Sequence, residues 1–210
     1  EQAVASTKAF IAQVTVLLLI GLHLADNRTP QFRQLLKDLD ELPKKAEAVL
    51  ASTEQIKKMA EKYSAYKDFL YIGRGYSYPC ALEGALKLKE ISYIHAEGYA
   101  AGEMKHGPLA MIDNNFATLA IAPDDTLLEK TYSNIQEIKA RGGPIIAIAT
   151  EGNKKIKKLV DDVIYIPKTL EQTQPILTAI VLQLFSYYAA IKKGKDVDRP
   201  RNLAKSVTVE

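Results

Sequence analysis

The chain has 210 residues, of which 47% are hydrophobic and 25% are charged. This composition is typical of a globular protein that is large enough to bury a substantial core, and it excludes a fibrous or disordered chain. The net charge is only +3 and the lysines are scattered rather than gathered in a basic arm, so we expect no nucleic-acid partner.

The single cysteine, Cys80, excludes an intramolecular disulfide framework and favours a reducing, cytoplasmic setting. Because no second thiol offers a metal site or a redox partner, we expect Cys80 to be a small buried helix residue. The strongest apolar run, residues 14–22, is too short and too polar at its edges for a membrane span, and we interpret it as a packing helix. The chain opens on Glu1 rather than methionine, which suggests a processed or excised piece.

Residues 1–65 show only helical patterns. Polar N-cap residues precede three segments, and in the second a proline occupies the first helical position. We expect Pro43 to break the second helix, because proline lacks the amide hydrogen that the helix needs. The predicted helices run from Ser6 to about Asp26, from Thr29 to Pro43, and from Ser52 to about Tyr66.

From residue 68 onward, short apolar runs alternate with helical stretches, which is typical of a parallel sheet wrapped by crossover helices. Strands are predicted at 69–72, 116–122, 145–149 and 163–166, with a weaker one at 95–99. Helices are predicted at 79–94, 127–140, 154–160 and 174–192. The sequence therefore predicts a five-stranded, doubly wound α/β unit over residues 66–195, preceded by the helical segment 1–65 and followed by a tail, 196–210.

Ligands of doubly wound sheets bind at the carboxyl ends of the strands, near the switch point. The loops at this edge are predicted at 73–78, 97–107 and 123–126. In the first loop, Gly73-Arg74-Gly75 suggests a dinucleotide-binding turn, but Tyr78 replaces its third glycine and no acidic residue closes a second strand. We therefore favour a glycine pair that only allows a sharp turn.

The segment 81–108 crowds acids, lysines and histidines among apolar residues, as proton-transfer sites do. Its first half predicts a helix in which Glu83, Lys87 and Glu90 project from one face. An exposed pair of Glu83 and Lys87 would contribute only about 0.3–0.5 kcal/mol. Apolar residues flank this polar stripe on both sides, however, so we expect it to line a cleft as an acid/base cluster.

The three histidines receive different interpretations. His106 lies in a Lys-His-Gly-Pro loop, where an exposed ring can titrate near neutrality and transfer a proton to a sugar oxygen. His95 is expected to be a hydrogen-bonded core residue, and His23 a helix residue without a role. Neither His95 nor His106 has a second histidine at ligand spacing and no Cys-x-x-Cys is present, so no metal site is predicted.

Residues 195–210 have the composition of a frayed tail. From Leu203 to Val209, however, the residue types alternate, and a disordered tail does not need such a pattern. If this tail closes over a site as a lid, Lys205 could reach a substrate carbonyl. A desolvated lysine is a Schiff-base nucleophile.

Several segments together resemble one family, the glutamine–fructose-6-phosphate aminotransferases, also called glucosamine-6-phosphate synthases. The matching segments are residues 5–10, 73–75, 81–95, 102–109, 198 and 200–210, so the resemblance spans essentially the whole chain. It implies a sugar isomerase (SIS) domain with a five-stranded parallel sheet of flavodoxin-like order. In this family the domain occurs as two tandem copies beside an amino-terminal glutaminase domain, and residues 1–65 would be left from the first copy and the linker between copies.

The same resemblance implies roles for individual residues in converting fructose 6-phosphate and ammonia to glucosamine 6-phosphate. Glu90 resembles the base that moves a proton between C1 and C2, Lys205 the lysine that forms the Schiff base, and His106 the ring-opening histidine, which enters the other subunit's site. Lys87 and Glu83 resemble polar neighbours of that base. Contacts with the sugar through backbone or hydroxyl groups are implied for Val4, Ser6 and Ala204. No redox cofactor, metal ion or pyridoxal phosphate is implied.

The resemblance also places the phosphate-binding Ser/Thr-rich loop and the glutaminase domain upstream of residue 1. We therefore expect the chain alone to bind fructose 6-phosphate weakly, to turn over slowly or not at all, and to take no ammonia from glutamine. The apolar face of the helices in 5–66, which the first copy would normally cover, predicts self-association as a homodimer. No membrane association is expected.

Two other functions are alternatives to this one. A noncatalytic sugar-phosphate-sensing module would keep the same fold, but it would not need Glu90, Lys205 and His106. The presence of all three residues therefore favours the enzyme. A dinucleotide-dependent oxidoreductase is disfavoured by its incomplete glycine turn.

Overall fold

A computed structural model describes residues 3–204 of the chain. Five parallel strands form one sheet in the order β2-β1-β3-β4-β5, with β1 paired to both β2 and β3. The strands are β1 (Asp68–Gly73), β2 (His95–Ala100), β3 (Phe116–Ala122), β4 (Ile145–Thr150) and β5 (Asp162–Ile166). This is the flavodoxin-like order, which confirms the predicted fold class and places the switch point between β1 and β3.

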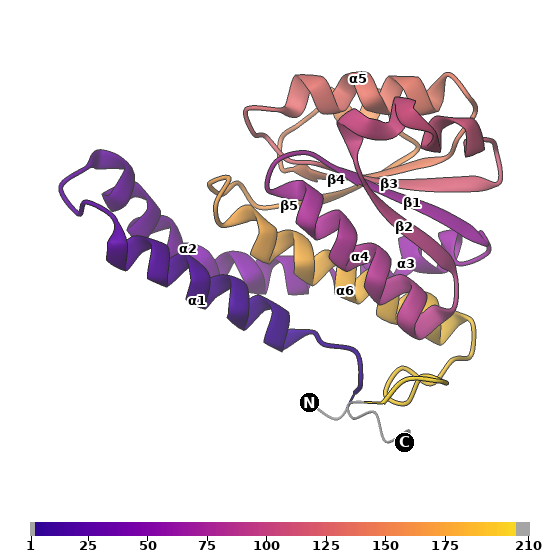
Figure 1. The fold of residues 1–210 in the computed structure, drawn as a ribbon, viewed down its shortest axis with the longest axis horizontal. Coiled ribbons are helices and arrows are strands. Elements are labelled where there is room, and N and C mark those ends of the chain that lie inside the picture. Colours follow the sequence, from indigo (N-terminus) through magenta and orange to yellow (C-terminus); the bar gives the residue numbers. More distant parts are fainter. Residues whose placement is uncertain (1–2, 205–210) are drawn as a thin grey trace.

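Helices cover both faces of the sheet (Figure 1). The α-helices are α1 (Lys8–Leu24), α2 (Pro30–Ala51), α3 (Thr53–Tyr63), α4 (Ser77–Ser92), α5 (Leu128–Lys139) and α6 (Gln174–Lys192). Three short 3-10 helices are η1 (Ala101–His106), η2 (Pro108–Met111) and η3 (Ile156–Lys158). In Figure 1, α5 lies above the sheet, while α3, α4 and α6 lie below it.

The central strands β1, β3 and β4 bury alternate side chains in two separate cores. In β1, Phe69 and Tyr71 belong to the core shared with α3, α4 and α6, whereas Leu70 and Ile72 belong to the core shared with α5. The central strands are buried on both faces, as parallel strands are in doubly wound folds. This explains why they appeared in the sequence as uninterrupted apolar runs.

The prediction that Pro43 breaks a helix was wrong, because α2 continues through it to Ala51. Leu42 and Val49, on either side of the proline, are buried in the core with α3 and α6, and this packing outweighs one missing hydrogen bond. The helix predicted at 154–160 was also wrong, since only the turn η3 forms there. Within this turn only the Ile156 side chain is fully buried, and the Ile156 amide donates a hydrogen bond to the Asn153 side chain.

Helices α2 and α3 share a core with the sheet. Ile56, Ala60 and Tyr63 of α3 are buried against it, and the Tyr63 hydroxyl donates to Asp162 at 2.7 Å. From α2, the buried Asp38 accepts hydrogen bonds from the segment before α6. The boundary at residues 65/66 remains a prediction, but these contacts show that α2 and α3 are packed on the sheet unit.

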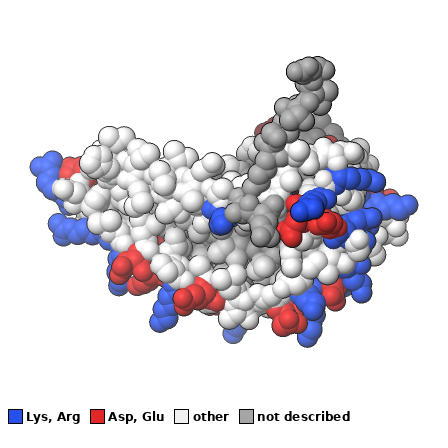
Figure 2. Space-filling view, turned by 90° about the horizontal axis from the view of Figure 1, so that it is seen from below, with Lys and Arg blue, Asp and Glu red and all other residues white. Residues whose placement is uncertain are grey.

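Helix α1 buries little of its apolar surface. Among its residues only Leu22 is buried. Figure 2 shows an uncharged area across the upper left of the molecule, with charged side chains at the left tip and along the lower edge. The exposed apolar side chains of α1 are Val16, Leu17, Leu19, Ile20 and Leu24. Self-association through this surface remains a prediction.

One described helix, α6, is long and apolar enough to cross a membrane by length and composition alone. Most of it, 67% of the apolar window, is buried inside the protein. This burial is what the central helix of a packed core shows.

Candidate active site

Helix α4 begins at a sharp glycine turn and lies close against the sheet. A Cβ on Gly73 would lie 2.3 Å from the Ser77 carbonyl oxygen, and Gly75 has a φ of +51°, so this turn requires glycine. This confirms the interpretation of the glycine pair as a turn. A Cβ on Gly98 of β2 would lie 2.8 Å from the Leu82 backbone, so this glycine allows the helix to approach the strand.

The predicted polar stripe on α4 is buried rather than solvated. Lys87 Nζ lies 2.6 Å from Glu90 Oε2, and their side chains are only 4% and 22% exposed. Glu83 is 8% exposed. Burial raises the pKa of the Glu83 carboxyl, although the positive charge of Lys87 and a hydrogen bond from Gln183 oppose this effect. The interpretation as an exposed pair of Glu83 and Lys87 is therefore wrong: Lys87 pairs with Glu90, and on this face of α4 Glu83 and Lys87 are buried while Glu90 is half-buried.

The segment before α1 forms one wall beside this stripe. The Val4 amide donates to the Asp198 carbonyl at 3.2 Å, and Ala5 is buried against Ile91 of α4. Ser6 follows and is half-buried. The structure therefore brings Val4 and Ser6 to the α4 face that carries the predicted acid/base residues.

A residue that the sequence analysis missed connects this wall to the stripe. Gln183 of α6 donates from Nε2 to the Thr7 carbonyl at 3.3 Å and to Glu83 Oε1 at 3.4 Å. Its signal in the sequence was a single amide within the apolar stretch of 175–191. The contact fixes one carboxylate oxygen of Glu83 and the chain that follows Ser6.

The carboxyl-terminal tail, which Val4 contacts at Asp198, also reaches the end of α4. A groove of about 550 Å³ runs between the end of α4 and the tail, and Glu90 opens into it. Its other lining residues include Leu86, Tyr93, Arg201 and Leu203. Ala204, predicted to contact the sugar, is exposed. Lys205 lies outside the described residues.

His106 does not join these residues within one chain. It ends η1 with its ring 77% exposed, and Nε2 lies 3.6 Å from Glu103. Because α4 runs antiparallel to the strands, Glu90 is near the amino edge of the sheet, whereas η1 follows β2 at the carboxyl edge. A strand of six residues separates the two edges by roughly 20 Å.

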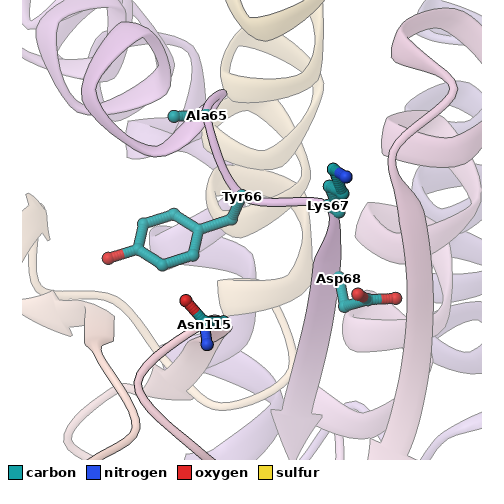
Figure 3. Close-up of a pocket in the computed structure, with 5 residues that line it drawn as sticks. All are labelled: Ala65, Tyr66, Lys67, Asp68 and Asn115. Carbon is teal, nitrogen blue, oxygen red and sulfur yellow. The ribbon is translucent and has the colours of Figure 1, made fainter.

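Of the remaining hollows, two lie at ends of the sheet strands, and neither is lined by a predicted site residue. The one at the switch point, about 440 Å³, is lined by Tyr76, Asp125 and Glu171 among others, and burial raises the pKa of the Asp125 carboxyl. Two carboxylates make it a poor site for a phosphate. The other hollow, about 380 Å³, lies at the amino end of β1, where Figure 3 shows Tyr66 and Asn115 on the same side of the strand.

The other two histidines also differ from each other. His95 was predicted to be a core residue, but it is exposed at the start of β2, where Nδ1 lies 2.9 Å from Asp68. Strand pairing places this first residue of β2 at the open edge of the sheet. His23 is an exposed residue of α1.

Within residues 3–204, no group of three or more histidine, cysteine or acidic side chains is arranged to hold a metal ion.

Known proteins match this chain over its whole length. The chain is 50% identical to the isomerizing glutamine–fructose-6-phosphate aminotransferase of Thermotoga maritima and 52% identical to that of Chlorobaculum tepidum. In both comparisons it is covered completely but spans only 35% of the relative.

Solved structures show the same fold. The C-terminal domain of glucosamine-fructose-6-phosphate aminotransferase from Francisella tularensis matches 93% of this chain, and 56% of its own, with a TM-score of 0.85 and 40% identity. Tagatose-6-phosphate ketose/aldose isomerase from Escherichia coli matches 80% of this chain and 47% of its own with a TM-score of 0.68. At 18% identity, this second likeness shows the fold alone.

A family model described as the SIS domain matches residues 63–193, which covers the sheet and helices α4 to α6. The chain therefore belongs to the SIS domain family and resembles, along its whole length, the carboxyl-terminal part of glutamine–fructose-6-phosphate aminotransferases.

Proposed function

We propose that this chain supplies the acid/base part of a site that converts fructose 6-phosphate and ammonia to glucosamine 6-phosphate. The observation that carries the proposal is the row of Glu83, Lys87 and Glu90 on one face of α4, in which Lys87 pairs with Glu90 and Glu90 lines the groove beside the tail. The relatives' printed names supply the substrate and the reaction class.

The geometry suits a proton shift between two neighbouring carbons. Glu90 is open to the groove and takes the proton from C1 of the open-chain sugar and returns it to C2. Lys87, at 2.6 Å, holds the Glu90 carboxylate in place and offsets its charge. Glu83 lies one turn further along the same face. Val4 and Ser6 contact the sugar from the amino-terminal segment, and Ala204 contacts it from the tail.

Two further groups complete the chemistry in this proposal. The Lys205 amine condenses with the C2 carbonyl and releases water. Ammonia then displaces the Lys205 amine from this imine, which frees the lysine and leaves an imine of ammonia at C2 that acidifies the C1 proton. His106 opens the sugar ring. Because it lies at the opposite sheet edge from Glu90, it acts in the site of a second subunit, which makes a homodimer part of the proposal.

The phosphate group needs an anchor that the α4 cluster does not provide, since two of its three charged groups are carboxylates. We propose that this anchor, and the source of ammonia, belong to the remainder of a longer cytoplasmic enzyme. The chain alone then binds fructose 6-phosphate weakly, turns over slowly or not at all, and releases no ammonia from glutamine.

The test is isomerisation of fructose 6-phosphate to glucose 6-phosphate by the chain, with and without an added upstream SIS copy. We expect activity, in the chain alone or after this addition, to be lost in Glu90→Gln and Lys205→Ala. The matched control is Glu54→Gln, at an exposed position of α3, which should keep full activity. Equal activity in Glu90→Gln and Glu54→Gln would refute the proposed role of Glu90. Tight binding of the sugar phosphate without any turnover would favour a noncatalytic sensing module.

A further inference from the structure

Tyr93 has a backbone conformation that its side chain does not favour. It follows the last residue of α4 and has a φ of +61°. Helices that end in this left-handed conformation strongly prefer glycine, because any Cβ there is strained. A tyrosine at this position therefore indicates that its side chain is needed for something other than ending the helix.

The side chain of Tyr93 holds the tail by three contacts. Its hydroxyl oxygen accepts a hydrogen bond from the Arg201 amide at 2.8 Å. The Arg201 guanidinium carbon lies 4.3 Å from the ring centroid, and Lys195 Nζ lies 5.5 Å from it. Both distances are within the range of cation–π attraction. One ring thus contacts the beginning and the end of the segment 195–201.

The intervening segment is shaped to return to this ring. The Asp196 carboxylate accepts from the amides of Asp198 and Arg199 at 2.9 and 3.0 Å, which closes a turn. Val197 packs beside Ala5, and Pro200 is buried. These contacts order a tail whose composition alone suggested fraying.

Tyr93 also lies one helical turn after Glu90, and both line the groove. We propose that Tyr93 is a positioning residue that fixes residues 195–203 as the tail wall of the groove beside Glu90. Its consequence for catalysis rests on the proposed function, because Ala204 and Lys205 follow this wall in the sequence. The anchoring of the tail does not rest on it.

Limited trypsin digestion of the whole chain, followed by mass spectrometry, tests the anchoring directly. Trypsin cleaves after Lys195 and after Arg201, whereas the bond after Arg199 precedes proline and resists. Tyr93→Gly removes the ring and gives the helix end its preferred residue. We therefore expect cleavage after Arg201 to accelerate by at least about tenfold, with an unchanged or higher melting temperature.

Two further variants separate the ring from the hydroxyl and from general effects on α4. Tyr93→Phe keeps the ring but loses the hydrogen bond to Arg201, so cleavage should accelerate by a few-fold only. Tyr76→Phe, at the other end of α4 with an exposed ring, should leave the rate unchanged.

Unchanged tail cleavage in Tyr93→Gly would overturn the proposal. So would an acceleration equal to that at sites outside the tail, because it would show general loosening. If Tyr93→Gly did not fold, Tyr93→Phe would decide alone, and a wild-type rate there would overturn the proposal. The digestion uses no substrate, so failure of the turnover assay would count against the proposed function and not against the anchoring.

Discussion

Replacing Asp38 by alanine should destabilise the whole protein, because this carboxylate links α2 to the segment before α6. Asp38 accepts hydrogen bonds from Lys45 at 2.5 Å, from Thr169 at 2.7 Å, from the Leu170 amide at 3.3 Å, and from Thr173. Its side chain is 9% exposed. Burial opposes its ionisation, but these four donors outweigh burial and lower its pKa.

The magnitude follows from what the donors lose. A hydrogen bond to a charged group contributes about 1.5–3 kcal/mol, so four would sum to roughly 6–12 kcal/mol. Three donors keep other partners, however: Thr169 and Thr173 lie 2.8 Å apart, and Lys45 remains 3.4 Å from Glu41. We therefore expect a loss of about 3 kcal/mol, which lowers the melting temperature by about 6–12 °C.

Thermal and guanidinium unfolding followed by circular dichroism measure this loss, with Asp40→Ala at an exposed position of the same helix as the control. Because the pKa of Asp38 is lowered on folding, its stabilisation is present above the unfolded value of 3.8 and is lost as the pH falls through the lower folded value. The difference in the free energy of unfolding between Asp38→Ala and wild type should therefore shrink as the pH falls below 3.8. Equal stabilities of Asp38→Ala and Asp40→Ala at neutral pH would refute the reasoning.

Three further outcomes are expected. Glu83→Gln should raise the melting temperature at neutral pH by about 2–4 °C. Burial raises the Glu83 pKa, so the charged carboxylate destabilises the folded state at neutral pH and the neutral amide does not. Thermal melts should show that this gain vanishes below about pH 4.5, where the carboxyl is protonated in both states. Gly84→Ala should cost about 1–3 kcal/mol in guanidinium melts, because its Cβ would lie 2.8 Å from the Tyr71 ring. Cys80 should resist a thiol reagent at mildly alkaline pH until the protein unfolds, because burial raises its pKa to about 12.

The strands and most helices could be predicted from the sequence because burial on both faces leaves a strong apolar signal. The run 116–122 appears unchanged as β3, and α6 has its predicted bounds. Local propensity failed where packing outweighed it, at Pro43. It failed again at 154–160, where one buried isoleucine supports no more than a turn.

The site was only partly predictable. Helical spacing placed Glu83, Lys87 and Glu90 on one face, but it could not decide which carboxylate Lys87 pairs with, since both i−4 and i+3 neighbours are within reach. Contacts between distant segments left no local pattern. Gln183 on Glu83 and Arg201 on Tyr93 join residues 100 and 108 positions apart, so only the folded chain reveals them.

The most direct test of the central claim is a hybrid enzyme in which this chain replaces the matching part of the Thermotoga maritima relative, which is 50% identical to it. Formation of glucosamine 6-phosphate from fructose 6-phosphate and glutamine is measured for the hybrid, its Glu90→Gln variant and its Glu54→Gln control. The account predicts an active hybrid and control, with kcat lowered at least about 100-fold in Glu90→Gln, the usual effect of losing a general base. A Glu90→Gln hybrid as active as the control would contradict it.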